Sequence, residues 1–192
     1  MAQATGGKHY TKNKQGQPYV DQNFDNYSVE YTYADGTKLM HYGRTIEGCH
    51  NEFASYIHGT KGFGTFSKNG HWPAPSALYT GLTPNPKNQT WKFPARETNP
   101  YQDEWDDLLD AIRNDKPYNE AERGALASQV CNMGRMAAHT GQKVMWDDAL
   151  NADPLAPDLE NLVGLDGDAP VKANADGSYP APQPGITKNR EY

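Results

Sequence analysis

The sequence predicts an α+β fold, with an open, mostly antiparallel sheet, two main helices packed on one face, and a proline-rich extended C-terminal arm. Three observations predict it. Short segments that alternate β-forming and polar residues recur in the first third of the chain, separated by turn residues. Two segments with helical periodicity follow between residues 99 and 141. After residue 150, proline, glycine, aspartate and asparagine dominate.

The strands are expected in consecutive hairpins. The pair Asp35-Gly36 is a strong hairpin signal, and residues 59–62 form a second glycine-rich turn. Because hairpin-connected strands are antiparallel, one face of the sheet can stay open. The predicted strands span residues 3–7, 27–33, 37–42, 53–58, 63–66, 91–93 and 143–146.

The first helix is predicted from its N-terminal signal and its periodicity. Asn99 suits the N-cap, Pro100 suits the first helical position, and Pro117 ends the helix. One face carries apolar residues at helical spacing, namely Trp105, Leu108, Leu109 and Ile112. The acidic residues beside this stripe are typical of a solvated helix face.

The second helix is predicted from near Asn119-Glu120 to Thr140-Gly141. Its small residues, Gly134 among them, would allow close approach to the sheet. Its inner stripe is expected to hold Leu126, Val130, Met133 and Ala137. A helical turn is predicted at residues 147–150.

The composition predicts one domain over residues 1–150 and an extended tail over 151–192. Residues 68–99 are predicted to be a long loop, because prolines interrupt them throughout. A connection of that length is often functional or wraps a partner.

Charge and hydropathy exclude several classes of protein. The net charge of −6 argues against a nucleic-acid-binding protein. No segment approaches the roughly 20 apolar residues of a membrane span, and no signal peptide is recognisable, so the compartment stays unknown and cytoplasmic by default. Cys49 and Cys131 are expected to be buried thiols rather than a disulfide.

Several catalytic and cofactor motifs are missing from the sequence. The string of residues 59–64 has the wrong glycine order for a dinucleotide-binding loop and sits in a predicted hairpin. The six histidines show no metal-ligand spacing, and no G-x-S-x-G elbow occurs. We therefore expect this chain to bind no metal and no cofactor, and we assign no catalytic residue.

Two polar clusters are candidates for a binding site. One follows the strand over residues 3–7, and the other leaves the strand over residues 37–42. Polar groups at strand ends suit hydrogen bonding to a polyhydroxylated ligand, although each cluster alone also fits ordinary loop chemistry. The candidate substrate-binding residues are Lys8, His9, Tyr10, Arg44, His50 and Asn51.

The order of the motifs resembles the bacterial branch of the Gfo/Idh/MocA oxidoreductases over nearly the whole chain. The helical region matches most closely. The matching strings are Gly6-Gly7-Lys8-His9-Tyr10, Tyr33-Ala34-Asp35-Gly36, His58-Gly59-Thr60-Lys61-Gly62, Asn99-Pro100-Tyr101, Ile112-Arg113-Asn114-Asp115-Lys116-Pro117, Asn119-Glu120-Ala121, Met133-Gly134-Arg135-Met136-Ala137-Ala138, Thr140-Gly141-Gln142-Lys143-Val144, Trp146-Asp147 and Pro184-Gly185-Ile186-Thr187-Lys188.

The resemblance implies the C-terminal α+β domain of an enzyme that oxidises or reduces sugars, inositols and related polyols with NAD or NADP. In that family the domain lines the sugar site, its open sheet face commonly mediates oligomerisation, and the cofactor sits on an N-terminal Rossmann domain. We therefore expect a homo-oligomer formed through the sheet face, and a substrate-facing role for the six candidate residues.

The sequence departs from the family in one respect. It lacks the Glu-Lys-Pro segment with the catalytic lysine and the Asp-x-x-x-His pair that follows it. Asp115-Lys116-Pro117 matches the family's helix-end pattern instead. Hydride transfer requires the nicotinamide to be positioned against the substrate carbon, so we expect this chain to be inactive by itself.

Two other functions remain open. The chain could be a stand-alone, non-catalytic binding or assembly subunit that completes the active site of a partner. It could also be a cofactor-independent sugar epimerase or lyase, with His9 or His50 as the base. Fold-level analogy alone does not decide between these functions.

Overall fold

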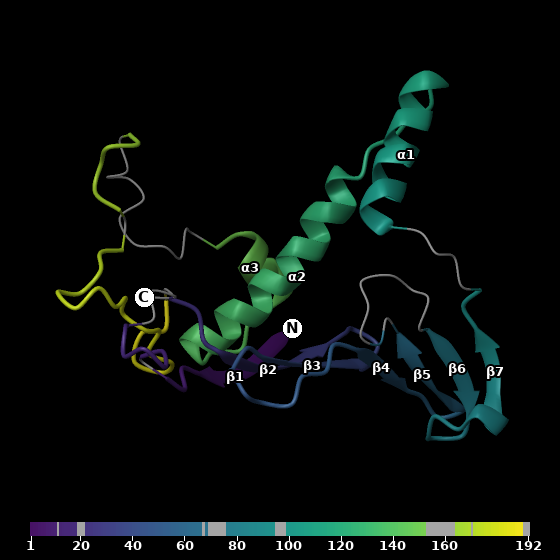
Figure 1. Ribbon diagram of the computed structural model, residues 1–192, viewed down its shortest axis with the longest axis horizontal. Helices are drawn as coiled ribbons and strands as arrows, with labels where there is room; N and C mark the ends of the chain where they lie inside the picture. Colours follow the sequence, from purple (N-terminus) through teal and green to yellow (C-terminus); the bar gives the residue numbers. More distant parts are fainter. Residues whose placement is uncertain are drawn as a thin grey trace. The chain divides into compact units, whose positions relative to one another are not determined.

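The computed structural model in Figure 1 describes residues 1–10, 12–18, 22–66, 68, 76–94, 99–152, 164–169 and 171–189. The chain divides into two compact units. The first unit combines Met1–Glu47 with Glu120–Tyr192, and the second is Gly48–Asn119. Along the sequence, the second unit is therefore inserted into the first.

The first unit contains a three-stranded antiparallel sheet in the order β1-β2-β3. Its strands are β1 (Ala2–Gly7), β2 (Asn26–Thr32) and β3 (Lys38–Arg44). The predicted hairpin turn between β2 and β3 is confirmed. The backbone N–H of Thr37 donates to Oδ1 of Asp35 at 2.9 Å, and Gly36 takes the positive φ of 85° that glycine tolerates best.

Helix α2 (Ala121–Thr140) packs against β1 and β2 (Figure 1). The approach is close because Gly134 has no side chain, and a Cβ there would lie 2.2 Å from the hydroxyl oxygen of Tyr31. That hydroxyl donates to the carbonyl oxygen of Val130 at 3.0 Å. The expectation of close packing through small residues is therefore confirmed. The buried core of this unit contains Ala2, Met133, Ala137, Val144 and Ala149.

The segment after α2 differs from the predicted strand. Gly141 ends the helix in the left-handed conformation, with φ 69°. Only Val144 then pairs with β1, through reciprocal backbone hydrogen bonds with Ala2 of 2.7 and 2.8 Å. Helix α3 (Trp146–Leu150) begins two residues later, so the chain has no room for a longer strand. The predicted helical turn is confirmed and starts one residue earlier than expected.

The second unit contains a four-stranded antiparallel sheet in the order β4-β5-β6-β7. Its strands are β4 (Ser55–His58), β5 (Gly62–Phe66), β6 (Ala77–Thr80) and β7 (Gln89–Lys92), with a 3-10 turn, η1 (Pro86–Asn88), before β7. Strand β6 lies within residues 68–99, which the sequence predicted to be loop, and it pairs with β5 and β7.

Helix α1 (Pro100–Arg113) belongs to this second unit. Its predicted start is confirmed, since Oδ1 of Asn99 accepts the backbone N–H of Tyr101 at 3.0 Å and Pro100 occupies the first turn. Its apolar stripe is not the buried face that the periodicity predicted. Trp105 and Ile112 are 61% and 67% exposed, and within its unit α1 makes no extensive contact with β4–β7.

The α+β class, the antiparallel strands and the two main helices are thus as predicted. The strands form two sheets where the sequence predicted one. Strand β3 ends at Arg44, and no tight turn joins it to β4, which starts at Ser55 and pairs with β5 instead. Helix α2 takes the predicted place of a helix packed on a sheet face, against β1 and β2 of its own unit.

The C-terminal arm has neither helix nor strand in its described residues, 151–152, 164–169 and 171–189. It groups with the first unit, where the backbone N–H of Gly185 donates to the carbonyl oxygen of Thr140 at 2.9 Å and Pro182 is buried. The boundary predicted at residue 150 stays a prediction. Prolines of the predicted loop and arm that lie outside the described residues are Pro73, Pro75, Pro154, Pro157 and Pro170.

Both cysteines are free and exposed, so the expectation of buried thiols is wrong. Cys131 lies on α2 two residues before the buried Met133, a spacing that puts the two side chains on nearly opposite helix faces. Within the described ranges, no helix is both long and apolar enough to cross a membrane.

Candidate functional site

Four of the six predicted substrate-binding residues lie at one end of the three-stranded sheet. Gly7 pairs with Asn26, and Asn26 pairs with Arg44. Strands β1 and β3 therefore end at the same edge, about 10 Å apart across β2. We call Lys8, His9, Tyr10 and Arg44 the strand-end cluster.

The other two, His50 and Asn51, lie in the second unit, in the exposed segment that precedes β4. Their predicted substrate-binding role stays a prediction.

Asp25, directly before β2, holds both sides of the strand-end cluster. Its Oδ2 accepts the backbone N–H of His9 at 2.5 Å and that of Tyr10 at 3.4 Å. Its carbonyl oxygen accepts the backbone N–H of Thr45 at 2.8 Å, next to Arg44. A single residue thus fixes the backbone after β1 and the backbone after β3.

Asn26 reinforces this arrangement. Its Nδ2 donates to the carbonyl oxygen of Gly7 and to Oδ1 of Asp25, both at 2.9 Å. The Asp25 carboxylate therefore uses one oxygen toward the segment after β1 and the other toward Asn26. Charge-assisted bonds of this kind are stronger than bonds between neutral groups.

The side chains of the cluster face water. His9, Tyr10 and Arg44 are exposed, and Lys8 is half-buried. The His9 and Tyr10 rings meet edge to face, with their centroids 5.0 Å apart. A guanidinium, an ammonium, an imidazole and a phenol together provide many donors and two aromatic faces on a fixed backbone. This set can bind hydroxyl groups by hydrogen bonds and the C–H face of a ring by stacking.

Beneath the cluster lies a buried group that sequence reasoning missed. His139, in the last turn of α2, is fully buried, and its Nε2 lies 2.8 Å from the Tyr27 hydroxyl. The Phe24 ring packs over Gly6, where an added Cβ would lie 2.7 Å from it. Neither Asp25 nor His139 stands in a recognisable motif, so no sequence signal marked them.

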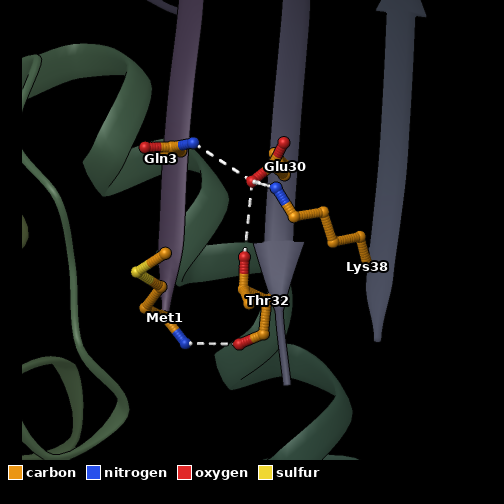
Figure 2. Close-up of polar contacts among 5 residues, drawn as sticks. All are labelled: Met1, Gln3, Glu30, Thr32 and Lys38. Atoms are coloured by element: carbon orange, nitrogen blue, oxygen red, sulfur yellow. Dashed lines mark hydrogen bonds and ion pairs between the residues drawn. The ribbon is translucent and has the colours of Figure 1, made fainter. Parts of the chain in front are cut away.

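A second polar cluster lies at the opposite end of the same sheet. Oε1 of Glu30 accepts hydrogen bonds from Lys38 at 2.7 Å, Gln3 at 3.1 Å and Thr32 at 3.3 Å. Figure 2 shows these contacts. The hydrogen bond from Lys38 is the main reason why the pKa of Glu30 lies below its usual range. The Met1 amino group donates to the Thr32 carbonyl oxygen at 2.9 Å. Because the carboxylate already has matched donors, this network fits a structural role.

The glycine-rich residues 59–64 do not form a dinucleotide cradle. A dinucleotide cradle requires a strand that leads through a glycine-rich turn into a helix N-terminus. Residues 59–64 instead connect β4 to β5, with the Gly59 N–H donating to the Gly62 carbonyl oxygen at 2.9 Å. Within the described ranges, no three His, Cys, Asp or Glu side chains gather as metal ligands.

Comparison of the chain with protein-family models, with curated proteins and with solved structures finds no match. The resemblance to the Gfo/Idh/MocA oxidoreductases therefore stays a prediction that rests on the motifs in the sequence.

Proposed function

We propose that this chain forms the substrate-binding side of an NAD- or NADP-dependent sugar or polyol oxidoreductase. The observation that supports the proposal is the register of the three-stranded sheet. That register places Lys8, His9 and Tyr10 at the same edge as Arg44, on backbone that Asp25 holds from both sides.

The chemistry of the strand-end cluster suits a polyhydroxylated ring. Arg44 offers up to five N–H donors in a planar fork, and His9 can both donate and accept. The Tyr10 ring, 48% exposed, offers an apolar face to the C–H side of a sugar while its hydroxyl stays available for hydrogen bonds. An exposed site of this kind fits a ligand that is closed in from its other side by another domain.

Because residues 59–64 form a hairpin turn and not a dinucleotide cradle, the proposal assigns the nicotinamide to another domain or polypeptide. The cofactor would supply the hydride chemistry, and this chain would bind and orient the substrate. The chain alone is then expected to show no turnover of NAD or NADP with any polyol.

Isothermal titration calorimetry with hexoses, pentoses and inositol tests the proposal. We expect binding in the millimolar range, weakened about tenfold by Arg44→Ala or His9→Ala through loss of charged or multiple hydrogen bonds. Lys87→Ala, an exposed cation in the second unit, is the matched control and should leave the affinity unchanged. Absence of binding at 50 mM ligand, or equal affinity in all variants, would contradict the proposal.

We further propose that the chain forms a homo-oligomer through the open face of the four-stranded sheet. The register aligns Ile57, Gly64, Leu78 and Trp91 in one row across the four strands. The three side chains of this row are 55%, 41% and 43% exposed, and contiguous exposed apolar surface marks interaction sites. Analytical ultracentrifugation should show a dimer or larger oligomer that Leu78→Lys dissociates. A wild-type monomer at 100 µM would contradict this.

A further inference from the structure

Three aromatic residues of the first unit form a buried cluster next to the strand-end cluster. We call Phe24, Tyr27 and His139 the aromatic triad. Phe24 is 6% exposed, and His139 is fully buried although it is a titratable side chain. A buried polar ring needs a hydrogen-bond partner, which the Tyr27 hydroxyl supplies.

The contacts of the triad join the start of β2 to the last turn of α2. The Tyr27 hydroxyl oxygen lies 2.8 Å from Nε2 of His139 and accepts the backbone N–H of Phe24 at 3.0 Å. The Phe24 ring meets the His139 ring edge to face, with centroids 4.8 Å apart and an interplanar angle of 72°. His139 is thus linked to Phe24 directly, by the ring contact, and indirectly, through the Tyr27 hydroxyl.

Phe24 of the triad directly precedes Asp25 in the sequence. With its N–H bound to Tyr27 and its ring against Gly6, Phe24 has its backbone and its side chain fixed. The N–H of Asp25 in turn donates to the Gly7 carbonyl oxygen at 3.1 Å. The Asp25 carboxylate is therefore held where it can accept the N–H groups of His9 and Tyr10.

We propose that His139 is a positioning residue for the strand-end cluster, acting through Tyr27, Phe24 and Asp25 without touching a ligand. The inference rests on the proposed function for its effect on substrate affinity. Its effect on the geometry of residues 9 and 10 is independent of that function. If His139 or the Tyr27 hydroxyl is removed, Phe24 loses a restraint, Asp25 gains freedom, and the segment after β1 loosens.

The first unit provides a matched control. Tyr31, four residues after Tyr27 on the same strand, also hydrogen-bonds to α2, through the carbonyl oxygen of Val130 at 3.0 Å. Its neighbours in the register are Ala2 and Leu39, at the end of the sheet opposite the strand-end cluster. Tyr31→Phe therefore removes a bond between a tyrosine and α2 that is distant from the cluster.

The experiment measures amide hydrogen exchange by NMR and sugar affinity by calorimetry in the full chain. Tyr27→Phe and His139→Phe are expected to raise the exchange rates of the His9 and Tyr10 amides roughly five- to tenfold, the range that loss of one buried hydrogen bond predicts. Sugar affinity should fall by a similar factor. His139→Gln, whose side-chain amide can donate to or accept from the Tyr27 hydroxyl, should restore part of both.

Tyr31→Phe should lower stability without changing either readout. The inference is overturned if Tyr31→Phe and Tyr27→Phe act alike on the His9 and Tyr10 amides, or if neither affects them. If the amide exchange responds as expected but the wild-type chain binds no sugar, the positioning role stands and the proposed function fails. If His139→Phe does not fold, Tyr27→Phe alone decides the question.

Discussion

The two sheets of this protein differ in what covers them. In the first unit, α2 lies close against β1 and β2, and Ala2 and Val29 are buried on the covered strands. In the second unit, Leu78 and Trp91 stay more than two-fifths exposed on a face that no described element of that unit covers extensively. The same antiparallel pairing thus yields a sheet covered by a helix in the first unit and a sheet without such a cover in the second.

The difference teaches that small residues decide the close contact here. Helix α2 places Gly134 and Ala137 against the sheet, and Tyr31 reaches over this surface to the helix backbone. Helix α1 carries a clear apolar stripe of large side chains, yet Trp105 and Ile112 remain mostly exposed. Apolar periodicity therefore identified an apolar face without identifying its partner.

The largest expected contrast is between one apolar residue of each helix, buried Met133 and exposed Ile112. Met133→Ala in α2 should lower the free energy of unfolding by about 2–5 kcal/mol, because it leaves a cavity in the buried core of the first unit. Ile112→Ala in α1 should change it by less than about 0.5 kcal/mol. Urea unfolding followed by circular dichroism measures both. Equal losses would mean that the Ile112 side chain is as well packed as that of Met133.

Two glycines of α2 sharpen the comparison. Gly134→Ala should destabilise by about 1–3 kcal/mol, because the new Cβ would displace the Tyr31 hydroxyl from its bond to Val130. Gly124→Ala meets nothing within 4 Å and should stabilise the same helix by up to about 1 kcal/mol through helix propensity. Thermal melts of the two variants test the sign of each change. Stabilisation by Gly134→Ala would refute the close approach of α2 to Tyr31.

The smallest expected effects concern two ion pairs, one in each unit. Hydrogen bonds from Lys38 and from Lys116 are the main reason why the pKa values of Glu30 and Asp110 lie below their usual ranges. A lowered folded-state pKa stabilises the fold at neutral pH. That contribution is lost as the pH falls from the unfolded-state pKa through the lowered one.

Lys38→Met should therefore raise the pKa of Glu30 and weaken this part of the acid dependence of stability. Carboxyl NMR titrations measure the shift. In 1 M NaCl the pKa of Asp110 should rise more than that of Glu30, since their side chains are 57% and 18% exposed. A larger salt effect on Glu30 would contradict the burial difference between the two pairs.

Local signals in the sequence predicted the elements that depend on neighbouring residues. The Asp35-Gly36 turn and the Asn99 cap formed as expected, because each is satisfied within a few residues of chain. Strand β6 was missed because its four residues depend on pairing with β5 and β7. The partner of each strand, and hence the number of sheets, is decided by such contacts and not by local propensity.

The candidate site was predictable to a similar extent. The strand end at Gly7 was predicted, whereas β3 runs two residues beyond the predicted strand over residues 37–42, to Arg44. Antiparallel pairing through β2 brings both ends to one edge. The support from His139 could not be predicted, since its partner Tyr27 lies 112 residues away in sequence. Its position depends on how α2 packs, which no short motif encodes.

The central claim is that the ligand site lies at the end of the three-stranded sheet and not on the four-stranded sheet. The direct test is a two-dimensional ¹H–¹⁵N NMR titration of the full chain with a sugar or inositol. The account predicts shift changes concentrated at the amides of His9, Tyr10 and Thr45, with the amides of β4–β7 unchanged. Changes concentrated on β4–β7, or none anywhere at saturating ligand, would contradict it.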